Sequence, residues 1–411
     1  MKITSSTPDD DVDLATVDLF DPGRYRDGCQ HAAWRTLRRH APVWRQHAAG
    51  GTPFWSVTRH ADCGRVLRDT ETFSSEHGTI LASVGVGDPA GGQTITLMDP
   101  PEHGEVRMPA MRLLSRSGVE RRTARIRERI DDLTASFVAA GGGDFAEVGR
   151  RLPMAMFGDL MGVPEPLWEE IGRWAAVSIA PEEPEYAVGA TVQETMLNAH
   201  HELFDLFTEA LRHRRRDPGD DLLTVLSSLT VRGRHLTMRE IVLNCYSYVL
   251  GAHSTTPHVA GHVLHILTQQ PELSAAVRAD HRLLPALVEE GTRWTSPTHH
   301  LIRRATRDTE LAGVRVRAGD WVCAWVASAN RDEDVFEDPY RFRIDRRSHG
   351  HLGFGAGPHF CVGTHLSRAA LVMLLTRLLR PSAVVEAVGE PTHLYSNWIN
   401  GLTHLPIGFR G

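Results

Sequence analysis

One cysteine of this chain lies in a segment whose composition suits a metal ligand. Cys361 belongs to the stretch Phe354-Gly-Ala-Gly-Pro-His-Phe-Cys-Val-Gly363. Its three glycines and one proline predict a tight, non-helical loop, and the apolar run from Thr364 predicts a helix directly after it. The thiol is therefore expected where a loop turns into a helix N-terminus. There, backbone N–H groups and the positive end of the helix dipole favour the thiolate form.

A thiolate held in this way is the ligand that a haem iron needs if electron density is to be pushed towards O–O cleavage. The other four cysteines are Cys29, Cys63, Cys245 and Cys323. They are far apart and form no CxxC pair, which excludes a disulfide framework and a zinc ribbon. We expect all four to be inert packing residues.

The composition indicates a globular protein that acts on a small molecule. The chain has 411 residues, a formal net charge of -6 and 41% hydrophobic residues. Its arginines are interleaved with carboxylates, which argues against a nucleic-acid partner. The first residues are acidic and lack an apolar signal-peptide core, and no uninterrupted apolar run reaches the roughly 18 residues of a membrane span. We therefore expect a cytoplasmic protein without a membrane partner.

Helical periodicity dominates the chain. Residues 119–139, 192–213 and 259–280 repeat apolar side chains at helical spacing. A capping box at Thr237 and Glu240 opens an apolar run that continues to about Leu267, which predicts one central helix of roughly 30 residues. Strand patterns are confined to 53–58 and 310–326, and a Gly- and Pro-rich loop is expected over 85–101. The predicted fold is mainly α with a small β region, in a single domain.

The segment around Cys361 resembles the haem-binding signature FxxGxxxCxG of the cytochromes P450, with matches at Phe354, Gly357, Cys361 and Gly363. Glu290-Gly-Thr-Arg293 is similar to the family's ExxR pair, and 338–342 (DPYRF) to its meander segment. The stretch 99–107 (DPPEHGEVR) is similar to a further haem-contacting motif. The resemblance runs from about residue 18 to residue 410. It implies the P450 fold over 18–411, after an N-terminal segment 1–17, and a haem b whose iron Cys361 ligates.

The resemblance also implies roles for other residues. Those expected to contact the haem are His103, Arg107, Arg303, His359, Phe354, Gly355, Gly363 and Ala252. Glu290, Arg293 and Arg341 are expected to form a charged core that shapes the cysteine loop, because a buried carboxylate and guanidinium are tolerated when they pair.

The central helix departs from the family pattern. Leu250-Gly-Ala-His-Ser-Thr-Thr-Pro257 aligns with the oxygen-activation motif, and Thr255 falls on the threonine that hydrogen-bonds oxygen in the family. The acid that normally precedes this threonine is here Ser254, which cannot ionise and so cannot relay protons as a carboxylate does. Pro257 is expected to accentuate a kink in this helix.

Two explanations of the missing acid remain open. A water chain, with His253 or His258, could take its place and support ordinary hydroxylation. Alternatively, the reaction could be an oxidative C–C or C–N coupling on an aromatic substrate. We therefore treat Thr255, Ser254 and His253 as the candidate catalytic residues.

Substrate contacts are expected on several segments that correspond to the family's recognition regions. The candidate residues are Val249, Thr298, His299, Ile302, Asn397, Trp398 and Ile399. Aromatic and amide groups near Trp398 favour a polar, aromatic substrate, such as a cyclodipeptide or another amino-acid-derived natural product, over a fatty acid or terpene.

The resemblance implies that O2 is a substrate and that a ferredoxin and a ferredoxin reductase supply electrons to a monomeric enzyme. Two other functions remain open from the sequence. One is a haem-binding recruitment or sensor protein without turnover, and the other is a peroxide-driven oxidase.

Overall fold

The computed structural model describes residues 11–346 and 350–410, so residues 1–10 of the predicted N-terminal segment lie outside the described part. The chain divides into two compact units. Unit 1 comprises residues 1–103, 292–361 and 395–400, and unit 2 comprises 104–291, 362–394 and 401–411. Two helices, α4 (Glu102–Leu114) and α14 (Leu284–Thr295), contain residues of both units.

Unit 1 is built on a mixed β-sheet with the strand order β1-β2-β10-β7-β3. The strands are β1 (Val43–His47), β2 (Pro53–Val57), β10 (Trp321–Ala324), β7 (Leu301–Ala305) and β3 (Phe73–Ser74). Only the β2–β10 pair of this sheet is parallel. A separate hairpin joins β8 (Thr309–Leu311) to β9 (Val314–Val316), and the helices of this unit are α1 (Gly23–Arg26), α2 (Gln30–His40), α3 (His60–Arg68) and α15 (Val326–Ala329).

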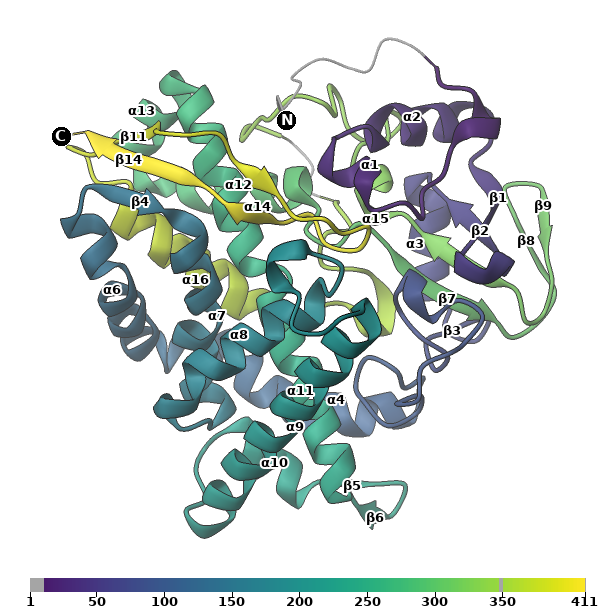
Figure 1. Cartoon of the computed structure of the whole chain (residues 1–411), viewed down its shortest axis with the longest axis horizontal. Helices are drawn as coiled ribbons and strands as arrows, with labels where there is room; N and C mark the ends of the chain where they lie inside the picture. Colours follow the sequence, from purple (N-terminus) through teal and green to yellow (C-terminus); the bar gives the residue numbers. More distant parts are fainter. Residues whose placement is uncertain (1–10, 347–349, 411) are drawn as a thin grey trace. The chain divides into compact units, whose positions relative to one another are not determined.

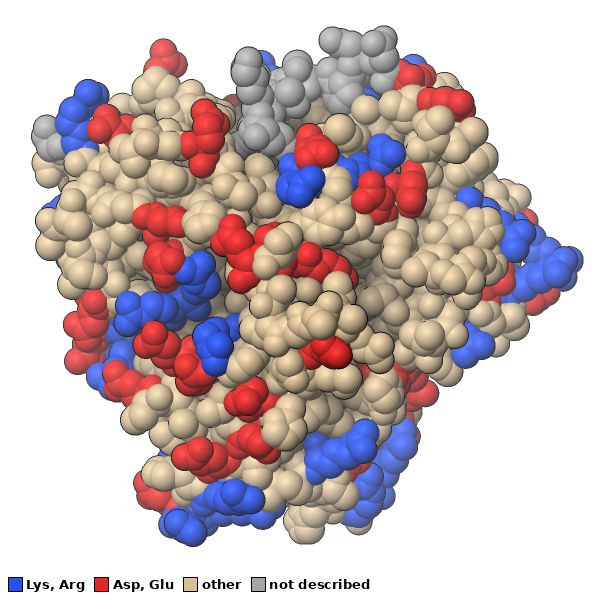
Figure 2. Space-filling model, viewed as in Figure 1, with Lys and Arg blue, Asp and Glu red and all other residues tan. Residues whose placement is uncertain are grey.

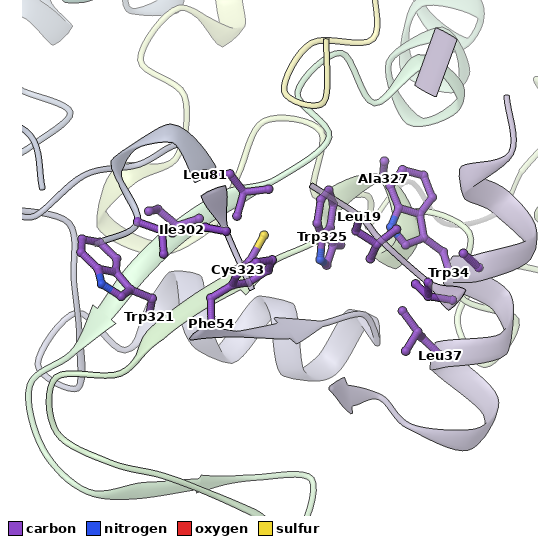
Figure 3. Close-up of a cluster of buried hydrophobic side chains, with 14 of the residues drawn as sticks. Leu19, Trp34, Leu37, Phe54, Leu81, Ile302, Trp321, Cys323, Trp325 and Ala327 are labelled. Atoms are coloured by element: carbon purple, nitrogen blue, oxygen red, sulfur yellow. The ribbon is translucent and has the colours of Figure 1, made fainter. Parts of the chain in front are cut away.

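One buried cluster of unit 1 lies between α2 and this sheet, and a second cluster involves α3. Figure 3 shows Trp34 and Leu37 of α2 together with Phe54 of β2 and Cys323 of β10. Trp325, which directly follows β10, is fully buried and donates its indole N–H to Ser56 Oγ at 3.0 Å. Large aromatic side chains bury much apolar area each, so this cluster fixes the sheet that carries Arg303.

Unit 2 is mostly helical. Its α-helices, apart from α4 and α14, are α5 (Arg116–Glu120), α6 (Thr123–Ala139), α7 (Phe145–Met161), α8 (Trp168–Ile179), α9 (Val192–Arg216), α10 (Leu222–Ser228), α11 (Met238–His253), α12 (Thr256–Gln269), α13 (Pro271–Ala279) and α16 (Thr364–Leu378). Its strands are β4 (Gly142–Asp144), β5 (Thr230–Val231), β6 (Arg234–His235), β11 (Val384–Ala387), β12 (Thr392–His393), β13 (Leu402–His404) and β14 (Pro406–Arg410).

Helices α6, α7, α8 and α9 of unit 2 pack against one another in that order, and α16 also packs on α6 (Figure 1). Basic and acidic side chains are interspersed over these helices on the face that Figure 2 displays. This face therefore shows no continuous basic block.

The predicted central helix is interrupted, which corrects the expectation of one continuous helix. The capping box at Thr237 and Glu240 starts α11 as predicted, but α11 ends at His253 and α12 begins at Thr256. Thr255 has φ -132° and ψ -62°, outside the helical region. Pro257 lies in the first turn of α12, where a missing N–H costs no helical hydrogen bond, so the chain breaks before the proline.

Other predicted elements are confirmed with shifted boundaries. The 259–280 pattern is divided at Gln270, just before Pro271, and the 119–139 pattern covers the end of α5 and the whole of α6. Segment 85–101 contains no helix or strand, as expected for a loop. The prediction of a mainly α fold with a small β region is confirmed. No helix in the described part of the chain has the length and apolar character needed to cross a bilayer.

A histidine joins three segments of unit 2. His404 at the end of β13 contacts Asp144 Oδ2 through Nδ1 at 2.6 Å and Glu185 Oε2 through Nε2 at 3.0 Å. Asp144 caps the N-terminus of α7, and Glu185 lies in the turn Pro184–Tyr186 that precedes α9. The hydrogen bond to Asp144 and the contact with Glu185 raise the pKa of His404 above its usual value, against the opposing effect of burial.

This raised pKa makes part of the stability pH-dependent. When the pKa of a group is higher in the folded state than in the unfolded state, the group stabilises the folded protein. This stabilisation is complete at pH values below the unfolded-state pKa and is lost as the pH rises through the folded-state pKa. Because the His404 side chain is 39% exposed, we expect its ionic contacts to contribute less than about 1 kcal/mol to the free energy of unfolding. His404→Gln should therefore lower the thermal midpoint by about 1–2 °C at pH 6 and hardly at all at pH 9.

Thermal unfolding of the wild type and the variant at both pH values checks this expectation. The exposed His213 of α9 provides the control, and His213→Gln should leave both midpoints unchanged. An equal loss for His404→Gln at pH 6 and pH 9 would contradict an ionic contribution from the histidine.

Candidate active site

The cysteine loop of unit 1 has the predicted form. Cys361 N–H donates to the carbonyl oxygen of Phe354 at 2.8 Å and closes the loop. Inside it, a short 3₁₀ turn covers Gly357–His359. Helix α16 follows, with Gly363 as its N-cap residue. The Cys361 thiol is thus two residues ahead of a helix N-cap, in the position that the sequence predicts for a thiolate.

Two glycines of this loop adopt conformations that other residues rarely adopt. Gly355 has φ +72° and Gly357 has φ +70°. A Cβ at Gly357 would lie 2.7 Å from Arg68 Cα and 2.8 Å from the Leu67 carbonyl oxygen, both at the end of α3. Only glycine therefore lets the loop pack this closely on α3, and this contact fixes where Cys361 lies within unit 1.

The five cysteines differ in their surroundings. Cys361 is exposed, whereas Cys63, Cys245 and Cys323 are buried, and burial raises the pKa of each of these three thiols. They are the inert packing residues that the sequence predicts. Cys29 is exposed as well, so the prediction that it is a packing residue is wrong. It directly precedes α2 and is not among the residues that this helix buries.

Two predicted haem contacts, His103 and His359, lie close together in unit 1, and Ser75 and Asp99 lie beside them. The rings of His103 and His359 have centroids 4.2 Å apart. Ser75 Oγ lies 3.2 Å from His359 Nε2, and the Ser75 N–H donates to Asp99 Oδ1 at 3.0 Å. Ser75 has no signal in the sequence, because its role depends on a loop brought there by the fold. Arg107 lies four residues beyond His103 on α4, as predicted.

The guanidinium of Arg303 is the most informative group of this cluster. Arg303 is 2% exposed on β7, and among the described residues no carboxylate forms an ion pair with it. Its Nη1 donates to the Ile302 carbonyl oxygen at 2.7 Å, while its Nε has no partner in the described chain. Burial lowers the pKa of Arg303 to about 10, although nearby Asp99 opposes this effect.

An isolated buried cation is costly unless an anion pairs with it. A haem carries two propionate carboxylates, and arginine is suited to bind a carboxylate through several N–H groups. The surroundings of Arg303 therefore fit a bound haem.

The charged core is only partly as predicted. Glu290 and Arg293 of α14 are both fully buried. Arg293 Nη1 donates to the carbonyl oxygens of Asn330 and Pro339, at 2.8 and 3.0 Å. The side chain of Arg341 is 68% exposed and faces Asp338 at 4.0 Å, so its predicted place in the core is wrong. Its backbone carbonyl accepts from Arg293 Nη2 at 3.3 Å instead, because the meander contributes oxygens of the main chain.

The helix break carries the candidate catalytic residues within unit 2. Thr255 Oγ1 donates to the Gly251 carbonyl oxygen at 3.0 Å, and Ser254 is buried beside it. The His253 ring bonds through Nδ1 to the Val249 carbonyl oxygen at 2.8 Å. Ala252 is half-buried in the last turn of α11. The break thus groups two hydroxyls and one imidazole, without a carboxylate on these residues.

The segments predicted to contact substrate lie side by side in unit 1. Thr298 forms an isolated antiparallel bridge with Ile399, and the His299 N–H donates to the Trp398 carbonyl oxygen at 2.8 Å. Trp398 is half-buried, and its indole Nε1 is a buried donor without a partner among the described residues.

Several of the predicted substrate contacts point elsewhere. His299 packs on Tyr25 with ring centroids 4.7 Å apart, and Ile302 belongs to the fully buried core of unit 1. Asn397 donates through Nδ2 to the Phe20 carbonyl oxygen at 2.7 Å. His299 and Ile302 are therefore packed into unit 1, and the side chain of Asn397 is held by a hydrogen bond within it. In unit 2, Val249 is also fully buried.

Comparison with known proteins agrees with this arrangement. A family model described as Cytochrome P450 matches residues 188–391. Cytochrome P450 NovI of Streptomyces niveus is 31% identical over 97% of this chain and 98% of its own length. Linalool 8-monooxygenase of Pseudomonas putida is 31% identical over 95% of this chain and 98% of its own length.

Among solved structures, P450 OxyD, which is involved in the biosynthesis of vancomycin-type antibiotics, is 30% identical with a TM-score of 0.84. The match covers 96% of this chain and the whole of the OxyD chain. The haem-thiolate chemistry of such proteins agrees with the cysteine loop and the buried cation described above. The chain therefore belongs to the cytochrome P450 family and is a haem-dependent monooxygenase with a cysteine thiolate as axial ligand.

Proposed function

We propose that the Cys361 thiolate is the axial ligand of the haem iron. The observation that carries this assignment is the Cys361 loop itself: an exposed thiol two residues ahead of a helix N-cap, held by glycines that only a tight loop needs. The remaining exposed cysteine, Cys29, does not lie in a glycine-rich loop. It is the N-cap residue of α2, but its side chain accepts no hydrogen bond from the backbone N–H groups of that helix, and its Sγ only approaches the Asp27 carbonyl oxygen at 3.8 Å.

The haem propionates are proposed to bind Arg303, His103, His359 and Arg107. Arg303 would gain the anion that its burial calls for, and the two histidines could donate ring N–H groups to the same carboxylates. Ser75 would then hold the His359 ring in orientation, since Oγ lies 3.2 Å from Nε2. Phe354, Gly355, Gly363 and Ala252 are proposed as further haem contacts.

When bound, the haem supplies the redox chemistry by which O2 is activated. Thr255 and Ser254 are proposed to handle protons beside it. The Thr255 hydroxyl donates to Gly251, which leaves its oxygen lone pairs as acceptors for a second hydrogen bond. Because Ser254 cannot ionise, it can pass a proton only by exchanging one hydrogen bond for another.

The substrate is proposed to be a polar, aromatic natural product of amino-acid origin, such as a cyclodipeptide, oxidised by hydroxylation or by C–C or C–N coupling. The unpartnered Trp398 indole N–H supports a substrate with a hydrogen-bond acceptor. The involvement of OxyD in the biosynthesis of vancomycin-type antibiotics supports a natural-product substrate, whereas the name of linalool 8-monooxygenase points to a terpenoid alternative.

Electrons are proposed to come from a ferredoxin and its reductase, and the enzyme to be a cytoplasmic monomer. An acidic ferredoxin would be attracted by exposed arginines such as Arg112 of α4. Arg368 is already paired with Glu289.

Replacing the proposed ligand tests the central assignment. Cys361→Ala should abolish the absorption band of the reduced, CO-bound haem that marks thiolate ligation, because no other thiol lies in such a loop. Cys29→Ala removes the other exposed cysteine and should retain the band at full intensity. Persistence of the band in Cys361→Ala would refute the assignment.

Replacing Arg303 tests the fit to the propionates. Arg303→Met should accelerate loss of haem to an excess of haem-free globin by about tenfold to a hundredfold, as expected for one charged hydrogen bond. The same variant should leave the thermal midpoint of the haem-free protein unchanged or raised, since it removes an uncompensated buried charge.

The neighbouring Arg304 provides the matched control. Its guanidinium stacks over the Trp321 ring at 5.7 Å and is half-buried, because successive residues of a strand face opposite sides. Arg304→Met should retain haem as the wild type does. Equal rates of haem loss in the two variants would show that Arg303 does not bind the propionates.

The substrate class can be tested with the haem-loaded enzyme. We expect aromatic cyclodipeptides to shift the haem from low to high spin in a spectral titration, and terpenes and fatty acids to have little effect. Trp398→Phe keeps the ring but loses the N–H, and it should weaken the response by about tenfold. A response to terpenes or fatty acids alone would refute the proposed class.

A further inference from the structure

One buried tyrosine of unit 2 has a hydroxyl without a hydrogen-bond partner. Tyr248 of α11 is 6% exposed, and none of the described residues forms a hydrogen bond with its Oη. Burial raises the pKa of Tyr248, so the phenol keeps its proton at pH 7 and can donate it to an acceptor. Buried hydroxyls normally have a partner, because a buried polar group without one costs free energy. The missing acceptor therefore points to a ligand.

Tyr248 lies on the face of α11 that leads to the candidate oxygen site. Gly251 and Ala252 follow it by three and four residues, and residues at these spacings share one face of a helix. The Gly251 carbonyl oxygen accepts from Thr255 Oγ1 at 3.0 Å, and Ala252 is a proposed haem contact. Tyr248 is thus on the side of α11 to which the proposed function assigns the haem.

The other tyrosine of α11 faces different neighbours. Tyr246 Oη lies 2.7 Å from Ser178 Oγ of α8 and 2.8 Å from His200 Nε2 of α9. Its ring meets that of Phe204 edge-on, with centroids 5.6 Å apart. Two residues along an α-helix are rotated by about 200° about its axis. The two hydroxyls therefore have separate surroundings, and only that of Tyr246 is bonded to described side chains.

A cation acts on the Tyr248 hydroxyl. The positive charge of Arg107 on α4 partly opposes the effect of burial on the pKa of Tyr248, so the guanidinium is within electrostatic range of the phenol. A guanidinium carries N–H donors and no acceptor, so Arg107 cannot accept the hydrogen of Tyr248. An anionic oxygen can accept from both groups at once. The pair therefore suits an anion that lies between a phenol and a guanidinium.

A carboxylate fits this requirement. Its two oxygens offer about four lone pairs, enough for a phenol and a guanidinium together. A hydrogen bond from a hydroxyl to a carboxylate is short and is stronger than one between neutral groups. In the proposed function Arg107 binds a haem propionate, which is a carboxylate on the same side of α11.

We propose that Tyr248 Oη donates a hydrogen bond to the haem propionate that Arg107 binds. This inference rests on the proposed function, which assigns that propionate to Arg107. Tyr248 is then a cofactor-binding residue, and its bond ties the helix that leads to Thr255 to the edge of the haem. The family motif over 250–257 begins beyond Tyr248, so only its burial and its neighbours point to this role.

Removing the hydroxyl tests the proposal. Tyr248→Phe keeps the ring and should accelerate the loss of haem to an excess of haem-free globin by about tenfold, as expected for one hydrogen bond to a charged group. The haem-free variant should unfold at an unchanged or higher temperature, because the hydroxyl has no partner there. Haem loss at the wild-type rate would overturn the proposal. A lower midpoint of the haem-free variant would do the same, since it would reveal a bond within the protein.

Tyr246 provides the matched control, with the same substitution two residues away on the same helix. Tyr246→Phe removes hydrogen bonds to Ser178 and His200, which are internal to the protein. It should lower the thermal midpoint and release haem at the wild-type rate. Equal acceleration of haem loss in the two phenylalanine variants would show a general effect of packing around α11 and overturn the proposal.

An altered cofactor identifies the acceptor. The haem-free wild type and Tyr248→Phe are each loaded with an iron porphyrin that carries ethyl groups in place of both propionates. Without a carboxylate, the two proteins should lose this porphyrin at equal rates. A tenfold difference that persists would show that Tyr248 bonds to some other atom, and the proposal would fail.

A crystal structure of the haem-loaded enzyme tests the contact directly. We expect a propionate oxygen at about 2.7 Å from Tyr248 Oη. A water molecule bonded to Oη in place of the propionate would contradict the proposal.

Arg303→Met and the reduced-CO band separate this proposal from the proposed function. Tyr248→Phe should keep the band, because the thiolate ligand is unchanged. If Arg303→Met accelerates haem loss and Tyr248→Phe does not, only the role of Tyr248 is refuted. If neither variant loses haem faster than the wild type, the proposed propionate site fails as well.

Discussion

A buried positive charge without an anion is the constraint on which unit 1 depends. The Arg303 guanidinium lies on a strand in the middle of the sheet, where β10 on one side and β3 on the other hold the backbone. Asp99 is close enough to raise its pKa, yet burial has the larger effect and lowers that pKa. The free protein therefore carries a cost in free energy that an anionic ligand removes, so ligand binding and folding stability are linked.

The cysteine loop meets a different constraint, which is steric. Gly357 packs against the backbone of α3 at a distance that no side chain permits, and the Phe354 carbonyl closes the loop onto Cys361. The loop is thus shaped by contacts inside unit 1. Under the proposed function, the charge of Arg303 and the thiol of Cys361 would together bind an iron porphyrin that has acidic side groups.

The sequence predicts these local features well because they depend on neighbours along the chain. Glycine positions, the Thr237 capping box and the loop over 85–101 all follow from short-range rules. The break before Thr256 is not predicted. A proline inside a kinked helix and a proline in the first turn of a new helix have the same sequence pattern.

Features that depend on packing are predicted less well. Arg341 matches the motif, but the meander turns its side chain outward and uses its carbonyl. His299 and Ile302 occupy positions that suit a ligand, but the aromatic core of unit 1 buries them.

The contact between Gly357 and the end of α3 also bears on how the protein is made. Residues 67 and 68 leave the ribosome long before residue 357, and at usual rates of synthesis the interval is on the order of ten seconds to a minute. During that time the niche on α3 has no occupant, and strands β7 and β10 are missing from the sheet between β2 and β3. The nascent chain thus exposes unpaired strand edges. If Cys361 is the ligand as proposed, haem would be captured only when synthesis is nearly complete.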